Sequence, residues 1–275
     1  MKEDIIVVRG GGDIASGTIH KLHRCGFKVV ILEIEKPSAI RRTVCFSEAI
    51  YEGQSIIEGL VCKKANDLGE VYTILNKKNI PIIIDPLGKL IKQLKPFVVI
   101  DAILAKKNMG TTKDMAPITI GLGPGFLAGK DVHIVIETMR GHNLGRIIEQ
   151  GYAMANTGIP AVVNGVGKER VIYSPIIGNI SNVKKIGDMV EKGEVIATII
   201  NDKNIIEVKA SIDGILRGII RDKSKVKKGL KIADIDPRIE EVENSYTISD
   251  KARTIAGSVL EAILYLKENY KIKSI

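Results

Sequence analysis

The first part of the chain alternates short apolar runs with amphipathic segments. Residues 5–8 form a β-branched run, a glycine-rich turn follows at 10–12, and apolar positions with helical spacing extend to Gly26. A second apolar run covers 28–33. Continuous apolar runs of this length are typical of buried strands in parallel sheets. The pattern predicts strand, turn, helix and strand, which is the opening of a Rossmann-like sheet.

The same alternation continues further along the chain. Apolar runs that predict strands lie at 81–85, 96–101, 118–120 and 132–136, and helical patterns lie at 65–76 and 87–94. Two of these strands end in an acidic residue, Asp85 and Asp101. Strands that alternate with helices indicate a parallel sheet with helical crossovers.

An internal repeat follows the predicted sheet. Seven residues recur after 36 positions: Gly178, Val190, Lys192, Gly193, Ile196, Ala197 and Ile199 match Gly214, Val226, Lys228, Gly229, Ile232, Ala233 and Ile235. Each copy has the pattern of strand, glycine turn, strand, V-x-K-G turn and strand. One copy alone cannot bury its apolar face, so the repeat predicts a pseudo-symmetric antiparallel barrel of the biotinyl/lipoyl type.

The end of the sequence predicts a long helix. Ser249 suits a helix N-cap, and apolar residues from Ala252 to Leu264 follow at the spacing of one helical face. The predicted fold class is therefore α/β, with a Rossmann-like parallel sheet, a small all-β biotinyl/lipoyl-like barrel and a C-terminal helix that packs back. We assign residues 1–168 to the first domain, 169–238 to the barrel and 246–270 to the returning helix.

Composition narrows the class of ligand and the compartment. The 275 residues carry a formal net charge of +9, but no run of five basic residues occurs, which favours a small anionic ligand over nucleic acid. The three cysteines are widely spaced and form no C-x-x-C pair, as expected in a reducing compartment. No stretch approaches the roughly 20 apolar residues of a membrane helix. We expect a cytoplasmic protein without membrane association.

The glycine turn is the first candidate binding site. Gly10, Gly12 and Ala15 form the pattern G-x-G-x-x-A, and Gly11 and Asp13 belong to the same turn. Such a turn lets a pyrophosphate approach the backbone at a helix N-terminus. Glu33 ends the second strand, where a carboxylate would hold ribose hydroxyls. The alternative is a fold of the same shape with an empty or repurposed pocket.

Two further polar segments suit an anionic ligand. Arg41 and Arg42 follow the second predicted strand, and the guanidinium fork fits phosphate oxygens. A donor-rich stretch later in the chain contains Arg140, His142, Asn143 and Arg146. Together with a polar segment at 106–113 and a glycine-rich loop at 121–125, this stretch predicts an oxyanion or phosphate pocket at the strand ends. Ordinary solvated loops are the alternative for both segments.

Cysteine, histidine and lysine offer fewer candidates. Cys45 follows the two arginines, and a thiolate beside positive charge would be a reactive catalytic group, although a small buried residue is the simpler interpretation. His20, His23 and Cys25 do not share one helix face, so we predict no metal site. Lys203 lies where the hairpin between the barrel repeats would carry biotin or lipoate, but the Met-Lys-Met context is absent and we favour an unmodified barrel.

The motifs together resemble one known family. The segments V-R-G-G-G-D-I-A-S-G-T and I-R-R-T-V-C-F-S-E-A-I-Y-E-G are similar to YqeB-type accessory proteins of selenium-dependent molybdenum hydroxylase systems. So are G-L-G-P-G-F-L-A-G-K-D-V-H, E-T-M-R-G-H-N-L-G-R and K-A-R-T-I-A-G-S-V-L-E-A-I-L. The likeness spans nearly the whole chain. The glycine turn also resembles the Rossmann part of XdhC-type molybdenum-cofactor chaperones.

The resemblance implies a maturation role. Such a protein would bind the molybdenum cofactor, in its cytidine dinucleotide form where the pterin carries one, as cargo for a molybdenum hydroxylase apoenzyme. A selenium or sulfur delivery protein would be a further partner, with Cys45 as the thiol to test. The glycine turn would hold the dinucleotide, and the polar loops would face the metal-bearing end.

Three rival functions stay open at this point. An NAD(P)-dependent oxidoreductase shares the glycine turn, but no Tyr-x-x-x-Lys pair is present. A carrier module would have a modified Lys203. A non-catalytic interaction scaffold would leave the pocket empty. Whether the protein is an enzyme is left open, and a homodimer is our working expectation for its assembly.

Overall fold

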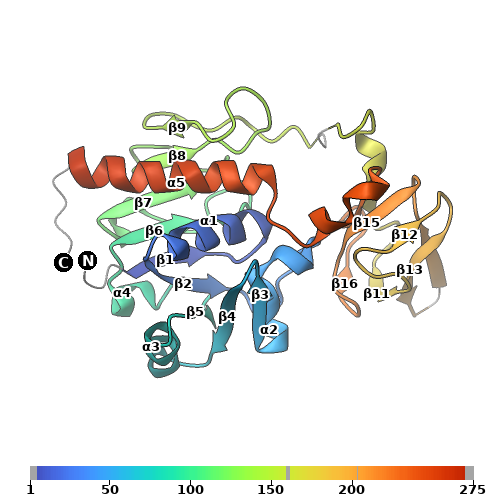
Figure 1. Cartoon of the computed structure of the whole chain (residues 1–275), viewed down its shortest axis with the longest axis horizontal. Coiled ribbons are helices and arrows are strands. Elements are labelled where there is room, and N and C mark those ends of the chain that lie inside the picture. Colours follow the sequence, from blue (N-terminus) through green and yellow to red (C-terminus); the bar gives the residue numbers. More distant parts are fainter. Residues whose placement is uncertain (1–4, 159–161, 203, 270–275) are drawn as a thin grey trace. The chain divides into compact units, whose positions relative to one another are not determined.

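The structure, a computed structural model, describes residues 5–158, 162–202 and 204–269. It divides into two compact units (Figure 1). Unit 1 combines Met1–Pro37, Cys45–Asn156 and Ile248–Ile275, and unit 2 combines Ser38–Val44 with Thr157–Thr247. None of the helices within the described ranges is both long and apolar enough to cross a membrane.

Unit 1 is built on a nine-stranded sheet. Its strands are β1 (Ile5–Arg9), β2 (Lys28–Glu33), β3 (Gln54–Ile57), β4 (Leu60–Ala65), β5 (Ile80–Ile84), β6 (Val98–Asp101), β7 (Ile118–Leu122), β8 (Ile134–Ile136) and β9 (Ile147–Ile148). The strand order is β3-β4-β5-β2-β1-β6-β7-β8-β9. Neighbours from β4 to β8 pair in parallel, whereas β3 and β9 pair antiparallel at the two edges.

The predicted fold class, with its Rossmann-like parallel sheet, is wrong, because the sheet is mixed. The connection from β2 to β5 contains a hairpin, β3–β4, that joins the same sheet as an antiparallel edge. Its two-residue turn has positive φ at Glu58 (44°) and Gly59 (83°), the backbone that a tight hairpin of primed type requires. At the other edge, β9 returns directly beside β8 without a helical crossover.

Helices cover both faces of the sheet. On one face α1 (Asp13–Arg24) and α5 (Asp250–Asn269) lie side by side (Figure 1). They pack on alternate strand residues such as Ile6, Val8 and Ile31. The intervening strand residues, such as Val7 and Val30, face α3 (Leu68–Asn76) and α4 (Ile91–Leu94) in a separate cluster. The short α2 (Ala49–Glu52) precedes β3.

Two predicted helices are shorter than expected, and capping explains one of them. The Asp67 side chain accepts a hydrogen bond from the Glu70 N–H, so α3 begins only at Leu68 and the preceding residues form β4. The pattern at 87–94 yields only the four residues of α4. The Ser249 hydroxyl accepts from the Ala252 N–H at the start of α5, as expected for a cap.

Unit 2 contains two antiparallel four-stranded sheets, β10-β17-β15-β12 and β14-β13-β11-β16. Their strands are β10 (Val171–Tyr173), β11 (Gly178–Asn182), β12 (Met189–Val190), β13 (Val195–Asn201), β14 (Asn204–Lys209), β15 (Gly214–Ile219), β16 (Lys225–Val226) and β17 (Lys231–Asp236). The short strand of each repeat pairs with the first strand of the other, β12 with β15 and β16 with β11. The sequence repeat is thus a structural repeat with exchanged strands.

The repeated glycines allow a close backbone approach. A Cβ on Gly178 would lie 2.6 Å from the carbonyl oxygen of Ile200, and one on Gly214 would lie 2.3 Å from that of Asp236. Ile200 and Asp236 are themselves 36 residues apart, so both copies use glycine for the same contact. This explains why glycine recurs at these two positions.

Candidate functional site

The glycine turn lies at the carboxyl end of β1, where the order of successive strands in the sheet reverses. β1 pairs with β2 on one side and with β6 on the other, and open α/β sheets bind ligands outside strand ends at such a point. Gly10 has φ of +95°, and a Cβ there would lie 3.1 Å from the carbonyl oxygen of Ala102, just after β6. Glycine at this position therefore serves the contact between two strand ends.

Gly11 and Glu33 hold each other within the turn. The Gly11 N–H donates to the Glu33 carboxylate (2.7 Å), whose other oxygen accepts from the Ile34 N–H (2.8 Å). The Gly11 carbonyl accepts from the Ser47 N–H (2.9 Å). Burial raises the pKa of Glu33, and the two N–H donors oppose this rise. The Glu33 carboxylate thus fixes the turn in the structure, whereas the sequence pattern predicts that it holds ribose hydroxyls.

Gly12 differs from Gly10 and Gly11 because it faces open space. It is the N-cap residue of α1, with an ordinary φ of −72° and no side-chain cap. A Cβ there would meet nothing within 4 Å. Space for a ligand at the helix N-terminus, where backbone N–H groups favour anions, is therefore found beside Gly12.

A buried ionic cluster lies directly beneath the turn. Arg9, the last residue of β1, donates to the Thr111 hydroxyl and to the carbonyls of Pro86 and Met109. The Thr111 hydroxyl donates to Asp101, the last residue of β6. Arg9 is 2% exposed and Asp101 is 1% exposed. Burial raises the pKa of Asp101, while Thr111, the Ile103 N–H and Arg9 oppose the rise.

Buried carboxylates recur at the strand ends along this edge. Asp85 accepts from the N–H groups of Lys89 and Leu90, and Glu137 accepts from those of Met139 and Met154. Asp101 and Glu33 also bind loop amides. Each carboxylate therefore ties a loop to its strand, which gives the ligand-facing loops a fixed backbone.

Charged side chains from three elements gather above the edge. The Arg140 guanidinium forms two hydrogen bonds of 2.7 Å with Asp250, the first residue of α5, and Asp250 raises its pKa. Burial lowers the pKa of Lys251, and Arg140 lowers it further. Asp13, Glu137 and Asp250 act in the opposite direction on Lys251, so all these groups lie within electrostatic reach of Lys251.

The predicted loop segments do meet at this edge. A Cβ on Gly125 would lie 2.7 Å from the backbone of Lys107, and one on Gly123 would lie 2.6 Å from the Thr138 hydroxyl. The loops after β6, β7 and β8 are therefore in direct contact. His142, Asn143 and Arg146 are exposed in the loop after β8, where Arg146 donates to the Asn143 side chain (3.3 Å).

Arg41 and Arg42 belong to unit 2, whereas the glycine turn belongs to unit 1. Arg41 donates to the backbone carbonyls of Asn244 (2.8 Å) and Thr247 (3.0 Å), and Arg42 donates to that of Ile219 (2.9 Å). The guanidinium groups thus bind the backbone of their own unit. Sequence spacing alone could not reveal that this segment enters another unit.

Two other sequence candidates are buried. Ala15 lies on the face of α1 that packs in the core, as close helix packing requires. Cys45 is 1% exposed, and the next residue, Phe46, donates its N–H to the Ser16 hydroxyl of α1. A reaction at the Cys45 thiol would require this segment to move. Lys203 lies outside the described residues.

Sequence reasoning missed Arg9 and Lys251 as site residues. The signal for Arg9 was a charged residue at the end of an otherwise apolar strand, opposite the acidic end of another. Lys251 gave no such signal, because its burial depends on how α5 packs. Among the described residues, no group of three or more His, Cys, Asp or Glu side chains could hold a metal ion.

Comparison with known proteins gives one curated relative and one domain. The chain is 47% identical over 262 residues to Uncharacterized protein YqeB of Escherichia coli (strain K12), which covers 95% of this chain and 48% of that protein. The chain thus spans about half the length of this relative. A family model described as "Biotin-requiring enzyme" matches residues 170–235. A biotinyl/lipoyl domain is therefore present, as the repeat predicted.

Solved structures that match this chain include an ectoine utilization protein and a succinylglutamate desuccinylase/aspartoacylase. The apo ectoine utilization protein EutE (DoeB) from Ruegeria pomeroyi is 9% identical, with 84% of this chain and 85% of that chain covered and a TM-score of 0.26. A succinylglutamate desuccinylase/aspartoacylase from Rhodobacter sphaeroides is 13% identical, with 84% and 85% covered and a TM-score of 0.28. At TM-scores this low, the likeness carries no conclusion about the chemistry of this chain.

Proposed function

We propose that unit 1 binds the molybdenum cofactor, with or without its cytidine dinucleotide, at the carboxyl edge beside Gly12. The protein would act as a maturation factor that assists loading or modification of this cargo for a molybdenum hydroxylase. The observation that carries the proposal is the open space beside Gly12 at the N-terminus of α1, with the half-buried cation Lys251 within electrostatic reach of Asp13 in the first turn of this helix. Phosphate oxygens are stabilised by both features.

The rim of this edge supports a ligand that also has an apolar or aromatic part. Exposed apolar side chains lie at or after the ends of β2, β5 and β6: Ile34, Ile84, Leu87, Ile103 and Met109. The pterin ring system would lie against such side chains while the phosphates lie at α1. The net charge of +9 favours association with an anionic cargo.

Sulfur or selenium handling by Cys45 stays a prediction from the sequence. Because Cys45 is 1% exposed, any competent state must open the segment around it. Cargo-dependent alkylation of Cys45, measured by mass spectrometry, tests this role. A Cys45 thiol that resists alkylation both with and without cargo would exclude this role.

The binding proposal is tested by anaerobic equilibrium titration with molybdenum cofactor, its cytidine dinucleotide form and NADPH. Gly12→Val places a side chain in the open space, and Lys251→Met removes a cation, so each should weaken binding of the molybdenum forms at least about tenfold. Lys77→Gln, an exposed cation on the opposite face of the sheet, is the matched control. Binding of NADPH alone would favour an oxidoreductase, and binding of none would favour an interaction scaffold.

A further inference from the structure

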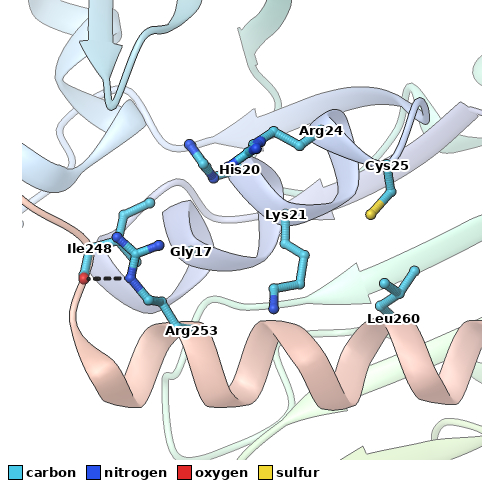
Figure 2. Close-up of a pocket in the computed structure, with 8 residues that line it drawn as sticks. All are labelled: Gly17, His20, Lys21, Arg24, Cys25, Ile248, Arg253 and Leu260. Atoms are coloured by element: carbon cyan, nitrogen blue, oxygen red, sulfur yellow. Dashed lines mark hydrogen bonds between the residues drawn. The ribbon is translucent and has the colours of Figure 1, made fainter.

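A second cationic site lies on unit 1, in a groove between α1 and α5 (Figure 2). The groove has a volume of about 390 Å³. Gly17, His20, Lys21 and Arg24 line it from one face of α1, and Arg253 lines it from α5. The two helices touch at Gly17, where a Cβ would lie 2.8 Å from that of Ala252. This groove lies along the helices, whereas the glycine turn lies at the N-terminus of α1.

The groove carries two positive charges without internal partners. Within the described residues, neither the Lys21 nor the Arg24 side chain makes a hydrogen bond or an ion pair. Arg253 does have a partner, because it donates to Glu58 at 2.6 Å. The Arg253–Glu58 pair is neutral overall, so the net positive charge of the groove comes from Lys21 and Arg24. A dianion would neutralise these two charges.

A buried histidine adds an unsatisfied polar atom. The His20 side chain is 7% exposed and lines the groove, and its Nε2 has no hydrogen-bond partner in the described structure. Glu58 Oε2 is 3.7 Å from this nitrogen. Burial lowers the pKa of His20, Glu58 opposes this, and Arg24 and Arg253 lower it further. Buried polar atoms are nearly always partnered, so an unpartnered one indicates a missing ligand or water.

We propose that this groove binds the phosphate group of a small phosphate monoester. A phosphate monoester carries about −1.5 to −2 charges at pH 7 and offers three acceptor oxygens. Arg24, Lys21 and Arg253 supply the donors, and His20 Nε2 interacts with a protonated phosphate oxygen or becomes protonated beside the dianion. Ile248 and Leu260 line the same groove, so the substituent on the phosphate is apolar in part.

Figure 2 shows how the parts of this site are divided along the groove. Lys21 extends from α1 towards α5, and Leu260 and Cys25 lie at the end away from Arg253. Cys25 is exposed, whereas Cys45 and Cys62 are buried. Alkylation of native protein therefore reports on Cys25, and a bound ligand should slow it.

The test uses phenyl phosphate and inorganic phosphate as probes, with the four histidine ring resonances followed by NMR. We expect saturable binding of phenyl phosphate, tighter than that of inorganic phosphate, with a shift of the His20 resonance and slower alkylation of Cys25. Arg24→Gln and Lys21→Gln should each weaken binding about tenfold, the loss of one charge-assisted hydrogen bond. Lys77→Gln should leave the affinity unchanged.

Three results would overturn the proposal. The first is no saturable binding of either probe, and the second is equal weakening by all three cation variants, which would indicate only non-specific charge attraction. The third is loss of binding in Gly12→Val but not in Arg24→Gln, because the probe would then occupy the glycine turn. Failure of Gly12→Val to affect molybdenum-cofactor binding concerns only the proposed function and leaves this groove site standing.

Discussion

Replacing Arg9 by methionine tests whether the buried cluster beneath the glycine turn fixes the site. The change removes the guanidinium and its hydrogen bonds to Thr111, Pro86 and Met109, yet keeps most of the side-chain volume. Asp101, 3.6 Å from Arg9, is left buried without its cation. Removing one partner of a buried ion pair costs about 3–5 kcal/mol, a large part of the roughly 5–15 kcal/mol that stabilises a domain.

The dependence of this cost on pH follows from Asp101. Because burial raises its pKa in the folded state, the neutral carboxyl stabilises the fold at pH below the unfolded value of 3.8, and this contribution is lost as pH rises through the folded pKa. Arg9 opposes that loss by favouring the charged form. The penalty of Arg9→Met should therefore be smallest in acid and grow as Asp101 ionises.

Urea unfolding followed by circular dichroism at the helix band measures this penalty. The helical signal reports on unit 1, because α1, α3 and α5 all belong to it. Arg146→Met, at an exposed position on the same edge, is the control and should change stability by no more than about 0.5 kcal/mol. An Arg9→Met penalty below about 1 kcal/mol at neutral pH, within the range of an exposed pair, would refute the cluster's role.

Three further predictions concern other parts of the fold. Gly125→Ala should destabilise unit 1 by about 1–3 kcal/mol in the same urea assay, because its φ is +114° and a Cβ would press on the Lys107 backbone; an unchanged midpoint would contradict this. The wild-type protein should gain stability as pH rises from the lowered pKa of His20 towards 6.5, and His20→Gln should lack this gain. Thermal midpoints of the two proteins that run parallel across that pH window would contradict this. Arg170→Met should weaken unit 2, measured by hydrogen exchange of its strand amides, but by less than Arg9→Met weakens unit 1, because Asp234 keeps two further cations within 4 Å; an equal or larger effect would contradict this.

Strands with continuous apolar runs could be located from the sequence. β2 has the bounds that the run at 28–33 predicted, and β1 extends the run at 5–8 by one residue. The hairpin β3–β4 was missed because its residues are half exposed and include Lys63 and Lys64. Edge strands lack the buried pattern that makes central strands recognisable. The mixed character of the sheet follows from these edges, so sequence pattern alone could not provide it.

The barrel and the site show the same contrast between local and non-local signals. The 36-residue repeat marked the barrel because a close backbone contact requires glycine twice. The glycine turn was also recognisable from a local pattern, but the different roles of its three glycines were not. Gly10 and Gly11 make internal contacts, and of the three only Gly12 faces open space. Arg41 donates to Asn244 and Thr247, and no local pattern could show these partners because they are distant in sequence.

The way the chain passes between its two units constrains how it can be made and dissected. Residues 38–44 enter unit 2 long before the strands of the barrel are synthesised, and α5 completes unit 1 only after those strands. During translation the apolar face of α1 therefore stays uncovered until α5 has been made, and Arg41 has no carbonyl partner at Thr247 until that residue has been made. A fragment containing only residues 157–247 would lack a segment that its own backbone carbonyls bind, at Ile219 and Asn244. The two units are consequently expected to mature together, because neither is complete before α5 and the residues near 247 have been synthesised.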